Sequence, residues 1–507
     1  MVTEITTIDY IVFLAFLAGI VLFGCSFYFR ERKQQSTGGF TVANGSMPSW
    51  VVGMSIFATF VSSISFLGYP GEAYANNWNP FVFSISIPAA AWLAAKLFVP
   101  LYRSMNSVSA YQYLEVRFGY WARAYVSVCY LLTQLARMGS ILFLLALPLN
   151  FMLGWSIPTI IIVTGVAVLL FASMGGIKAV VWTDAIQGII LILGALFCAV
   201  LLTVKIPGGL SQLISVGTEY HKFSMGSLGG SLTEKTFWVL LVYGLFTNLQ
   251  NYGIDQNYIQ RYLTAKDEHS AKNSTLFGGL LYVPVSLIFV YIGTALFVYY
   301  RTAGTLPSDV AGDQVFPYFI VHGLPTGLTG LMIASVLAAG MSTVSTSLNS
   351  ASTIILTDFY RHFRPKAGEK EGMAVLYISS VVLGILGVVV ALLMMGVDGV
   401  LDTWWKLASI FSGGMLGLFL LGFIVHKASN PAAVTGVIVG LLVIAWMSLS
   451  PYVFNGSWEQ YRCTLNGNLT IVFGTTAIFL TGFLATLLVG RRSDRKKADP
   501  EHVESNA

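Results

Sequence analysis

The feature that most constrains this chain is its succession of long apolar segments. A run of about 20 apolar residues spans a hydrocarbon core about 30 Å thick, and the sequence contains thirteen such runs. They cover residues 8–28, 48–69, 80–101, 122–152, 156–174, 181–203, 236–260, 275–299, 326–356, 373–396, 403–425, 431–450 and 468–489. Only 10% of the residues are charged, against roughly a quarter in soluble domains. The sequence therefore predicts an all-α membrane protein with thirteen transmembrane helices.

The distribution of basic residues predicts the orientation in the membrane. Cytoplasmic loops carry an excess of Lys and Arg. One set of alternate loops holds 20 basic residues and the opposite set holds 5. We therefore expect the N-terminus outside and the C-terminus inside, which requires an odd number of spans. The opening MVTEITTIDY has no basic stretch, so the first apolar run is predicted to be a retained helix and not a cleaved signal.

The loops leave little room for a second folded domain. The sequence contains no GxxxxGK[ST] phosphate loop, no metal-binding cysteine motif and no arrangement of a nucleophile with a base. We predict a single transporter domain over residues 1–490, followed by a cytoplasmic polar tail over residues 491–507. Neither enzymatic activity nor an organic cofactor is expected. The net charge of +5 reflects the topology, and no nucleic-acid partner is expected.

Two charged residues lie within predicted spans, where an isolated charge is costly. Arg137 stands midway along 122–152, in QLARMGS. It is predicted to contact a substrate or to form a structural pair inside the helix bundle. Asp184 lies in MGGIKAVVWTDAIQG and has no cation one helical turn away. Asp255, in contrast, is predicted to have a structural role, in a local pair with Arg261 or with a neighbour near the cytoplasmic end.

Two predicted spans are unusually polar. FATFVSSISFLGYP, residues 57–70, places three serines before a glycine and a proline. In LAAGMSTVSTSLNS, residues 337–350, the hydroxyls of Ser342, Ser345 and Thr346 share one helical face. Such hydroxyls, with the freed carbonyls of an interrupted helix, suit a small cation such as Na⁺. Close helix packing is the alternative explanation for either segment alone.

These segments resemble parts of the sodium:solute symporter family. GGIKAVVWTDAIQG is similar to a hallmark of that family, and FATFVSSISFLGYPGEAYANNW and AAGMSTVSTSLNSAST are similar to its first and eighth core helices. The resemblance extends over residues 8–490. It implies a LeuT-type inverted-repeat fold and a multi-pass protein of the cell membrane (inner or plasma membrane) that functions as a monomer. Its parts would be an extra N-terminal helix at 8–28, repeats at 48–204 and 236–425, and two trailing helices at 431–489.

The resemblance also implies two sites for Na⁺ as the coupling ion. The common site would use carbonyls and hydroxyls of Ala58, Val61, Ala339, Ser342 and Thr343. The second site, found in some members of the family, would fall on Asp184, Ser342, Ser345 and Thr346. All four of these positions carry oxygen ligands. A second ion therefore fits there, although Asp184 could instead orient the hydroxyl groups.

Within the family, SSISFLGYPGEAYANNW, SAYQYLEVRFG and QLARMGS most resemble the bacterial sialic acid transporters. In those proteins the arginine that matches Arg137 faces the substrate carboxylate, a pairing that a guanidinium makes with two hydrogen bonds. The residues that would bind substrate are Arg137, Phe60, Ser62, Ser63, Ser65, Ser84, Phe246, Asn248 and Gln250.

Two departures from that pattern bear on the substrate. Phe60 stands where a small hydroxyl residue is expected, and Phe83 and Ser84 stand where a glutamine is expected. The function implied is Na⁺-coupled import of a sialic acid (N-acetylneuraminate) by alternating access. The alternatives are a symporter for a neutral sugar or a monocarboxylate and, from another class, a non-transporting sensor, a receptor or a channel.

Overall fold

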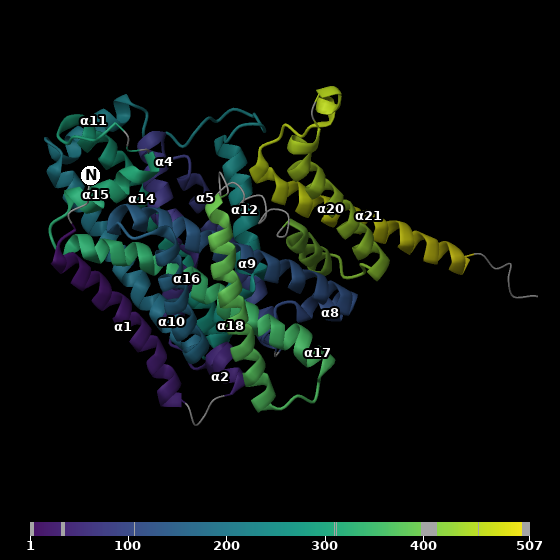
Figure 1. Cartoon of the computed structure of the whole chain (residues 1–507). Helices are drawn as coiled ribbons and strands as arrows, with labels where there is room; N and C mark the ends of the chain where they lie inside the picture. The colour runs from purple at the N-terminus through teal and green to yellow at the C-terminus, as the bar shows by residue number, and fades with distance from the viewer. Residues whose placement is uncertain are drawn as a thin grey trace, which may run out of the picture.

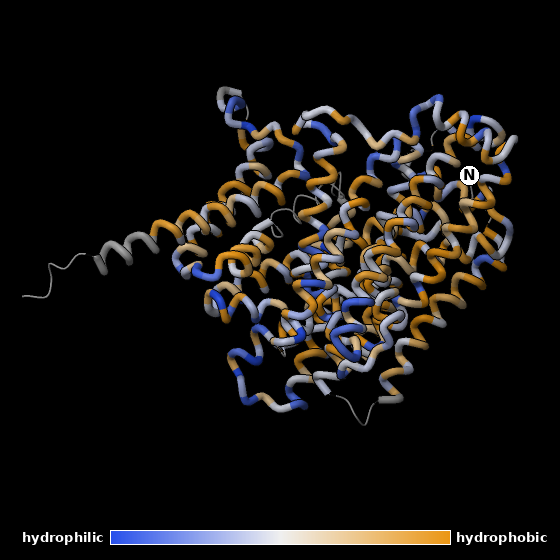
Figure 2. Tube along the Cα trace, turned by 180° about the vertical axis from the view of Figure 1, so that it is seen from behind, coloured by the Kyte–Doolittle hydropathy of each residue, from blue (hydrophilic) through white to orange (hydrophobic). Residues whose placement is uncertain are grey.

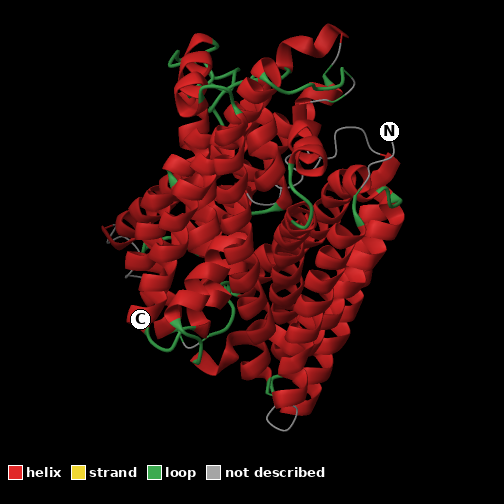
Figure 3. Ribbon diagram, turned by 90° about the vertical axis from the view of Figure 1, so that its left-hand side faces the viewer, coloured by secondary structure: helices red, strands yellow, loops and turns green. Residues whose placement is uncertain are grey.

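The computed structural model describes residues 5–31, 36–105, 107–308, 310, 312–396, 413–454 and 456–498. These residues are mostly helical and form no sheet (Figure 3). The α-helices are α1 (Thr7–Glu31), α2 (Thr37–Val42), α3 (Ser49–Phe60), α4 (Ser63–Ala75), α5 (Phe81–Ile85), α6 (Ile87–Leu93), α7 (Val99–Ser104), α8 (Gln112–Phe118), α9 (Tyr120–Leu153), α10 (Ile157–Lys205), α11 (Gly209–Glu219), α12 (Phe237–Ile254), α13 (Gln256–Thr264), α14 (Glu268–Thr302), α15 (Val315–Gly323), α16 (Leu328–Ile354), α17 (Arg361–Phe363), α18 (Glu369–Leu393), α20 (Asn430–Val453) and α21 (Thr470–Ala498). The predicted all-α class is confirmed.

Hydrophobic residues dominate the helices, while the connections at the two ends of the bundle are more hydrophilic (Figure 2). Within the described residues, nine helices are long and apolar enough to cross a membrane, and the bent pair of α3 and α4 makes a tenth. The total of thirteen spans and the orientation of the termini remain predictions.

Helix α10 contains two of the predicted spans in one run of 49 residues. Its kink lies at Gly176, with φ 56° and ψ −156°. A side chain at this position would need a left-handed backbone and would lie about 3 Å from the ring and backbone of Phe40 in α2. The second glycine of the GGIKAVVWTDAIQG segment therefore allows α10 to bend against α2.

Two other predicted spans differ in the structure. The span predicted at 236–260 is divided at Asp255 into α12 and α13. Most of the span predicted at 403–425 lies outside the described residues, and its end forms a short apolar helix at Gly413–Ile424. The polar tail predicted from residue 491 begins as a continuation of α21, which runs to Ala498.

Helix α16 forms the centre of the molecule. Among the long apolar helices of the described residues it is the most buried. In its apolar 18-residue stretch, 89% of the residues are buried inside the protein. It packs against α1, α9, α10 and α18 (Figure 1). Helices α3 and α4 pack against α14, while α20 and α21 pair with each other at the side of the molecule away from α1 (Figure 1). The polar segment 337–350 therefore lies at the core.

Candidate functional site

The first polar segment is a broken helix. Helix α3 ends at Phe60, and Val61 has an extended backbone with φ −77° and ψ 117°. Ser62 is also extended and caps α4, because its hydroxyl accepts the N–H of Ser65 at 3.4 Å. The two helices differ in direction by 51°. The break therefore lies at the serines, and Pro70 lies within α4.

The break leaves backbone carbonyls free for a ligand. The N–H of Val61 donates to Phe57 at 3.0 Å, and the N–H of Phe66 donates to Ser62 at 3.0 Å. Between these two bonds, the carbonyls of Ala58 and Val61 receive no backbone N–H from the described chain. They lie at the C-terminal end of α3, where the helix dipole is negative. The carbonyls predicted to bind Na⁺ are therefore available for a cation.

The second polar segment supplies hydroxyl groups in the buried core. Ser342 and Thr343 on α16 are each 1% exposed. The Thr343 hydroxyl donates to the carbonyl of Ala339 at 3.1 Å, and the Ser345 hydroxyl donates to the carbonyl of Ser342 at 3.0 Å. Two hydroxyl groups of the predicted ion sites therefore bond to carbonyls of their own helix.

Asp184 connects α16 to three other helices. Its carboxylate is fully buried on α10 and accepts the hydroxyls of Ser55 from α3 and Ser342 from α16, both at 2.7 Å. It also forms an ion pair with the Nη2 of Arg261 from α13, at 2.7 Å. Asp184 is therefore the point where α3, α10, α13 and α16 meet.

All three nitrogens of the Arg261 guanidinium donate hydrogen bonds. Its Nε donates to the Ser55 hydroxyl at 2.7 Å, its Nη1 donates to the carbonyl of Asn257 at 2.7 Å, and its Nη2 also donates to the Thr346 hydroxyl at 2.6 Å. Arg261 thus links Thr346 of the predicted second site to Asp184, which contacts Ser342 directly. It also places a positive charge beside that site.

Asp255 has a local structural contact, as predicted, but its partner is Asn257 and not Arg261. Asp255 caps the start of α13 by accepting the N–H of Asn257 at 2.8 Å, and Arg261 pairs with Asp184 instead. The partner of Asp184 comes from 77 residues further along the chain. The absence of a cation within one turn of Asp184 therefore did not mean that the carboxylate was unpaired.

Arg137 lies in the middle of α9 and is only partly buried. It has no hydrogen bond or ion pair to any residue in the described part of the chain. Its charge lies within electrostatic reach of Asp255 and Tyr258. The guanidinium that was predicted to contact substrate is therefore available for a ligand.

Phe60 belongs to a cluster of aromatic rings beside the helix break. Its ring centroid lies 4.6 Å from that of Tyr282, 5.8 Å from Tyr252 and 6.2 Å from both Phe83 and Tyr258. Tyr252, Tyr258 and Tyr282 are almost fully buried, whereas Phe60 and Phe83 are partly exposed. Tyr258 is a neighbour of both Phe60 and Arg137.

Helix α12 brings further predicted residues to Phe83. Phe246 packs in the same apolar cluster as Phe83. Asn248 is fully buried and donates to the carbonyl of Phe83 at 3.2 Å and the hydroxyl of Ser86 at 2.9 Å. Its side-chain oxygen has no partner among the described residues. Asn248 therefore has a structural role and still offers one acceptor.

Fewer contacts define the positions of the remaining residues predicted to bind substrate. Ser84 is buried on α5, next to Phe83 in sequence. Gln250 is 5% exposed on α12, and its backbone carbonyl accepts the N–H of Asp255 at 3.1 Å. Ser65 lies in the first turn of α4 and is partly exposed. The side chain of Ser63 lies outside the described residues.

The sequence interpretation missed several residues of this region. Ser55 and Arg261 bind Asp184 directly, and Tyr252 and Tyr282 surround Phe60. A partial signal existed for Ser55, which precedes the predicted ligand Ala58 by three residues and so shares its helical face. No local pattern indicated the tyrosines.

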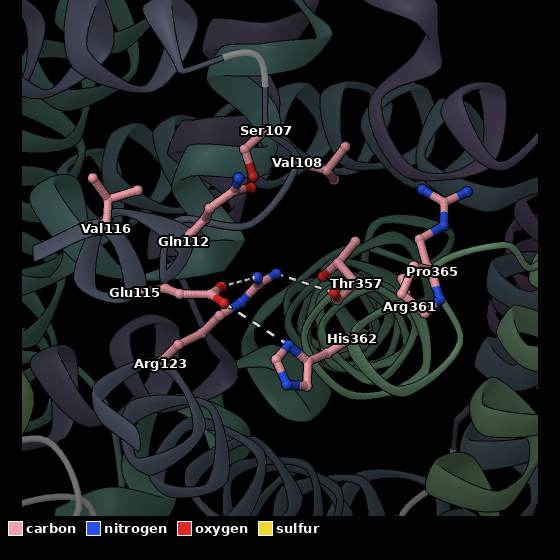
Figure 4. A pocket seen from close by; sticks show the side chains of 10 residues that line it. All are labelled: Ser107, Val108, Gln112, Glu115, Val116, Arg123, Thr357, Arg361, His362 and Pro365. Atoms are coloured by element: carbon pink, nitrogen blue, oxygen red, sulfur yellow. Dashed lines mark hydrogen bonds and ion pairs between the residues drawn. The ribbon is translucent and has the colours of Figure 1, made fainter. Parts of the chain in front are cut away.

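A separate cavity of about 630 Å³ lies between α8, α9 and α17 (Figure 4). Arg123 forms ion pairs there with Glu115 at 2.5 Å and with Asp358 at 2.7 Å. His362 lies 3.8 Å from Glu115, as the dashed line in Figure 4 shows. None of the predicted site residues lines this cavity.

Comparisons with known proteins identify relatives along almost the whole chain. The model of the sodium:solute symporter family matches residues 40–440. The sodium/sialic acid symporter SiaT of Proteus mirabilis is 31% identical over 503 residues, covering 98% of each protein. The sodium/sialic acid symporter NanT of Aliivibrio fischeri is 29% identical over 486 residues, covering 94% of this chain and 92% of its own length.

One solved structure matches the described fold closely. It is a Na⁺-coupled sialic acid symporter in a substrate-bound outward-open state, in which a novel Na⁺ site was found. The TM-score is 0.87 at 29% sequence identity, and the match covers 95% of this chain and 98% of that chain. The two chains therefore share one helical architecture.

Proposed function

This chain belongs to the sodium:solute symporter family, and we propose that it imports a sialic acid together with Na⁺ by alternating access. The relatives that are named sodium/sialic acid symporters support this substrate class. The observation that carries the proposal is Arg137, a partly exposed guanidinium in a predicted membrane span without a partner among the described residues. A carboxylate substrate would supply that partner.

We propose that the common Na⁺ site consists of the carbonyls of Ala58, Val61 and Ala339 with the hydroxyls of Ser342 and Thr343. The free carbonyls at the break and the buried hydroxyls of α16 support this assignment. The proposed second site consists of Asp184, Ser342, Ser345 and Thr346. An ion there would share Asp184 with Arg261, because that guanidinium already contacts both Asp184 and Thr346.

The substrate site proposed here lies between Arg137 and the aromatic cluster around Phe60. Arg137 binds the carboxylate, and Ser62, Ser63 and Ser65 at the start of α4 offer hydroxyl groups to the sugar. The N-terminal end of α4 adds a positive helix dipole that favours an anion. The remaining proposed contacts are Phe60, Ser84, Phe246, Asn248 and Gln250.

In the proposed cycle, Na⁺ holds the broken helix against α16 and favours the outward-open state. Substrate then fills the space beside the break, and the bundle exposes both solutes to the cytoplasm. The protein would act as a monomer in the cell membrane, with thirteen spans, two inverted repeats and no enzymatic activity.

Uptake into proteoliposomes tests this function. With an inward Na⁺ gradient, we expect accumulation of labelled N-acetylneuraminate, and little accumulation of galactose, proline or a short monocarboxylate. Replacing Na⁺ with choline should abolish uptake. Ser342→Ala should raise the Na⁺ concentration needed for half-maximal uptake. An unchanged Na⁺ requirement in this variant would contradict the common ion site.

Arg137→Ala tests the carboxylate contact. Hydrogen bonds to charged groups contribute about 1.5–3 kcal/mol, so the KM for N-acetylneuraminate should rise by at least about tenfold. Arg301→Ala is the control, because Arg301 is exposed and contacts the ring of Tyr220. Galactose uptake that survives Arg137→Ala would instead support the neutral-sugar alternative. Ligand binding without Na⁺-driven accumulation would support a sensor.

A further inference from the structure

Gln187 is a buried amide without a function in the sites described so far. It lies on α10 and is 2% exposed. Neither its side-chain nitrogen nor its oxygen has a hydrogen-bond partner among the described residues. Other buried amides with a missing partner, Asn248 and Asn349, each lack one for a single atom. A buried amide without partners is costly, so the position calls for an explanation.

The packing of α10 against α16 shows what Gln187 faces. Asp184 on α10 lies beside Ser342 on α16, because its carboxylate accepts the Ser342 hydroxyl. Ten residues further along α10, a side chain on Gly194 would lie 2.8 Å from Met332 and 3.3 Å from Ser335. The two helices are therefore antiparallel. Gln187 lies between these two contacts, one helical turn from Asp184.

This register places Gln187 opposite Ala339. Residues 332, 335, 339 and 342 form one stripe along α16, and Ala339 is the member of that stripe at the level of Gln187. The next residue of α10 faces the end of α3, because a side chain on Gly188 would lie 3.5 Å from Ala58. Ala58 and Ala339 are two of the proposed ligands of the common Na⁺ site. Gln187 thus lies at the level of that site.

An amide suits this position chemically. Its oxygen is a hard, neutral ligand for Na⁺ that cannot take up a proton in the physiological range, and its nitrogen can donate to a backbone carbonyl. The Ala58 carbonyl at the helix break has no backbone donor among the described residues. A purely structural glutamine would already have partners, as Gln256 does. That side chain donates to the carbonyl of Val108 at 2.7 Å and accepts the N–H of Ala110 at 2.9 Å.

We infer that the side-chain oxygen of Gln187 is an additional Na⁺ ligand, located between the common site and Asp184. This inference rests on the proposed Na⁺-coupled function. It gives the orphan amide a partner in the ion-loaded protein. It also places an uncharged oxygen on the route between the two proposed ion sites.

The test compares Gln187→Leu with Gln256→Leu by thermal unfolding of the purified protein in NaCl and in choline chloride. Leu at position 187 removes an orphan amide without changing the size of the side chain greatly. We therefore expect an unchanged or higher Tm in choline, but loss of most of the increase that NaCl gives the parent protein. Gln256→Leu should lower the Tm in both salts and keep the Na⁺-dependent increase.

Na⁺ titrations of the same variants give the second measurement. Mutation of the outer-shell partners of metal ligands costs about 10–100-fold in affinity, so loss of a direct ligand should raise the half-saturating Na⁺ concentration by at least about tenfold. Gln187→Glu, which keeps the oxygen, should retain the Na⁺ response. The inference would be overturned if Gln187→Leu lowered the Tm in choline and kept the Na⁺ response. It would also be overturned if the variant changed neither the Tm nor the Na⁺ titration. Absence of any Na⁺ response in the parent protein would instead count against the proposed function itself.

Discussion

At the scale of single residues, the ion pair of Asp184 and Arg261 has the clearest energetic consequence. Both side chains are at most 1% exposed, and removing one partner of a buried pair leaves the other charge uncompensated. Arg261→Gln should therefore destabilise the protein by about 3–5 kcal/mol. The measurement is the free energy of unfolding in detergent, and Asp184→Asn combined with Arg261→Gln should recover part of the loss.

Lys272→Gln provides the matched control for this prediction. Lys272 forms an exposed pair with Glu268 one turn away on α14, and such pairs contribute about 0.3–0.5 kcal/mol. A similar loss in both single variants, or no recovery in the double variant, would show that the buried pair does not provide the expected stabilisation.

The same pair shows what sequence reasoning could and could not reach. Asp184 could be singled out from the sequence, because a carboxylate is rare inside an apolar span. Ser342 and Thr346 are common residue types in membrane helices, so only their shared helical face marked them. The identity of the counter-ion was not predictable, because Arg261 is 77 residues from Asp184 in the chain. The nearer candidate, Asp255, instead satisfies an N–H at the start of α13, a local competition that the spacing did not reveal.

Phe60 offers a second test at the residue scale. Aromatic rings stack on the apolar faces of sugars, and Phe60 is held by four neighbouring rings. Phe60→Leu keeps an apolar side chain but removes the ring. We expect the KM for N-acetylneuraminate to rise several-fold, with uptake otherwise intact. Initial rates over a range of substrate concentrations measure this.

Phe57→Leu is the control for Phe60. Phe57 lies one turn earlier on α3 and is fully buried against Tyr282. Its replacement should lower thermal stability and leave the KM unchanged. If the two variants raise the KM equally, Phe60 acts through packing and not through contact with the substrate.

At the scale of helices, the polar residues of the first core segment mark the place where the span is interrupted. Of the serines, glycine and proline in FATFVSSISFLGYP, the serines mark the break: the backbone leaves the helix at Val61 and Ser62, whereas Gly68 and Pro70 lie within α4. Serine can cap a helix with its own hydroxyl, so the serines can both end α3 and start α4. Pro70 has no N–H to donate to the preceding turn, yet α4 continues past it to Ala75.

A lysine in the loop between α11 and α12 contacts the C-terminal end of α4. Lys222 is 4% exposed, and its ammonium donates to the carbonyls of Tyr74 at 2.6 Å and Asn76 at 3.1 Å. It also lies 4.0 Å above the ring of Phe297. Burial lowers the pKa of this ammonium below its ordinary value, so the carbonyl contacts only partly offset the loss of water. The contact nevertheless satisfies carbonyls at the C-terminal end of α4.

Lys222→Met tests how much this contact stabilises the protein. Methionine keeps much of the apolar stem and leaves the carbonyls at the end of α4 without their donor, which costs about 1–3 kcal/mol. The measurement is thermal unfolding together with hydrogen exchange of the backbone of α4, which should become faster. Lys205→Met is the control, because Lys205 is exposed and donates to Gly323 at 2.8 Å. Equal effects of the two variants would contradict this role.

At the scale of the whole molecule, the proposed ion sites lie where separate parts of the chain meet. Helices α3, α10, α13 and α16 all reach Asp184, whereas α20 and α21 pack mainly on each other at one side. Any relative movement of these helices would therefore change the geometry of the ion ligands. This arrangement can couple ion binding to exposure of the substrate site.

The orientation of the chain in the membrane is the last prediction, and it rests on the excess of 20 basic residues over 5. On a background with the four native cysteines replaced, we would introduce Lys235→Cys and Lys427→Cys. Both lysines are exposed, and they belong to opposite sets of loops. A membrane-impermeant maleimide should label position 235 in intact cells and position 427 only after permeabilisation. The reverse pattern would place the more basic set of loops outside, so the Na⁺ gradient would drive export through the same fold.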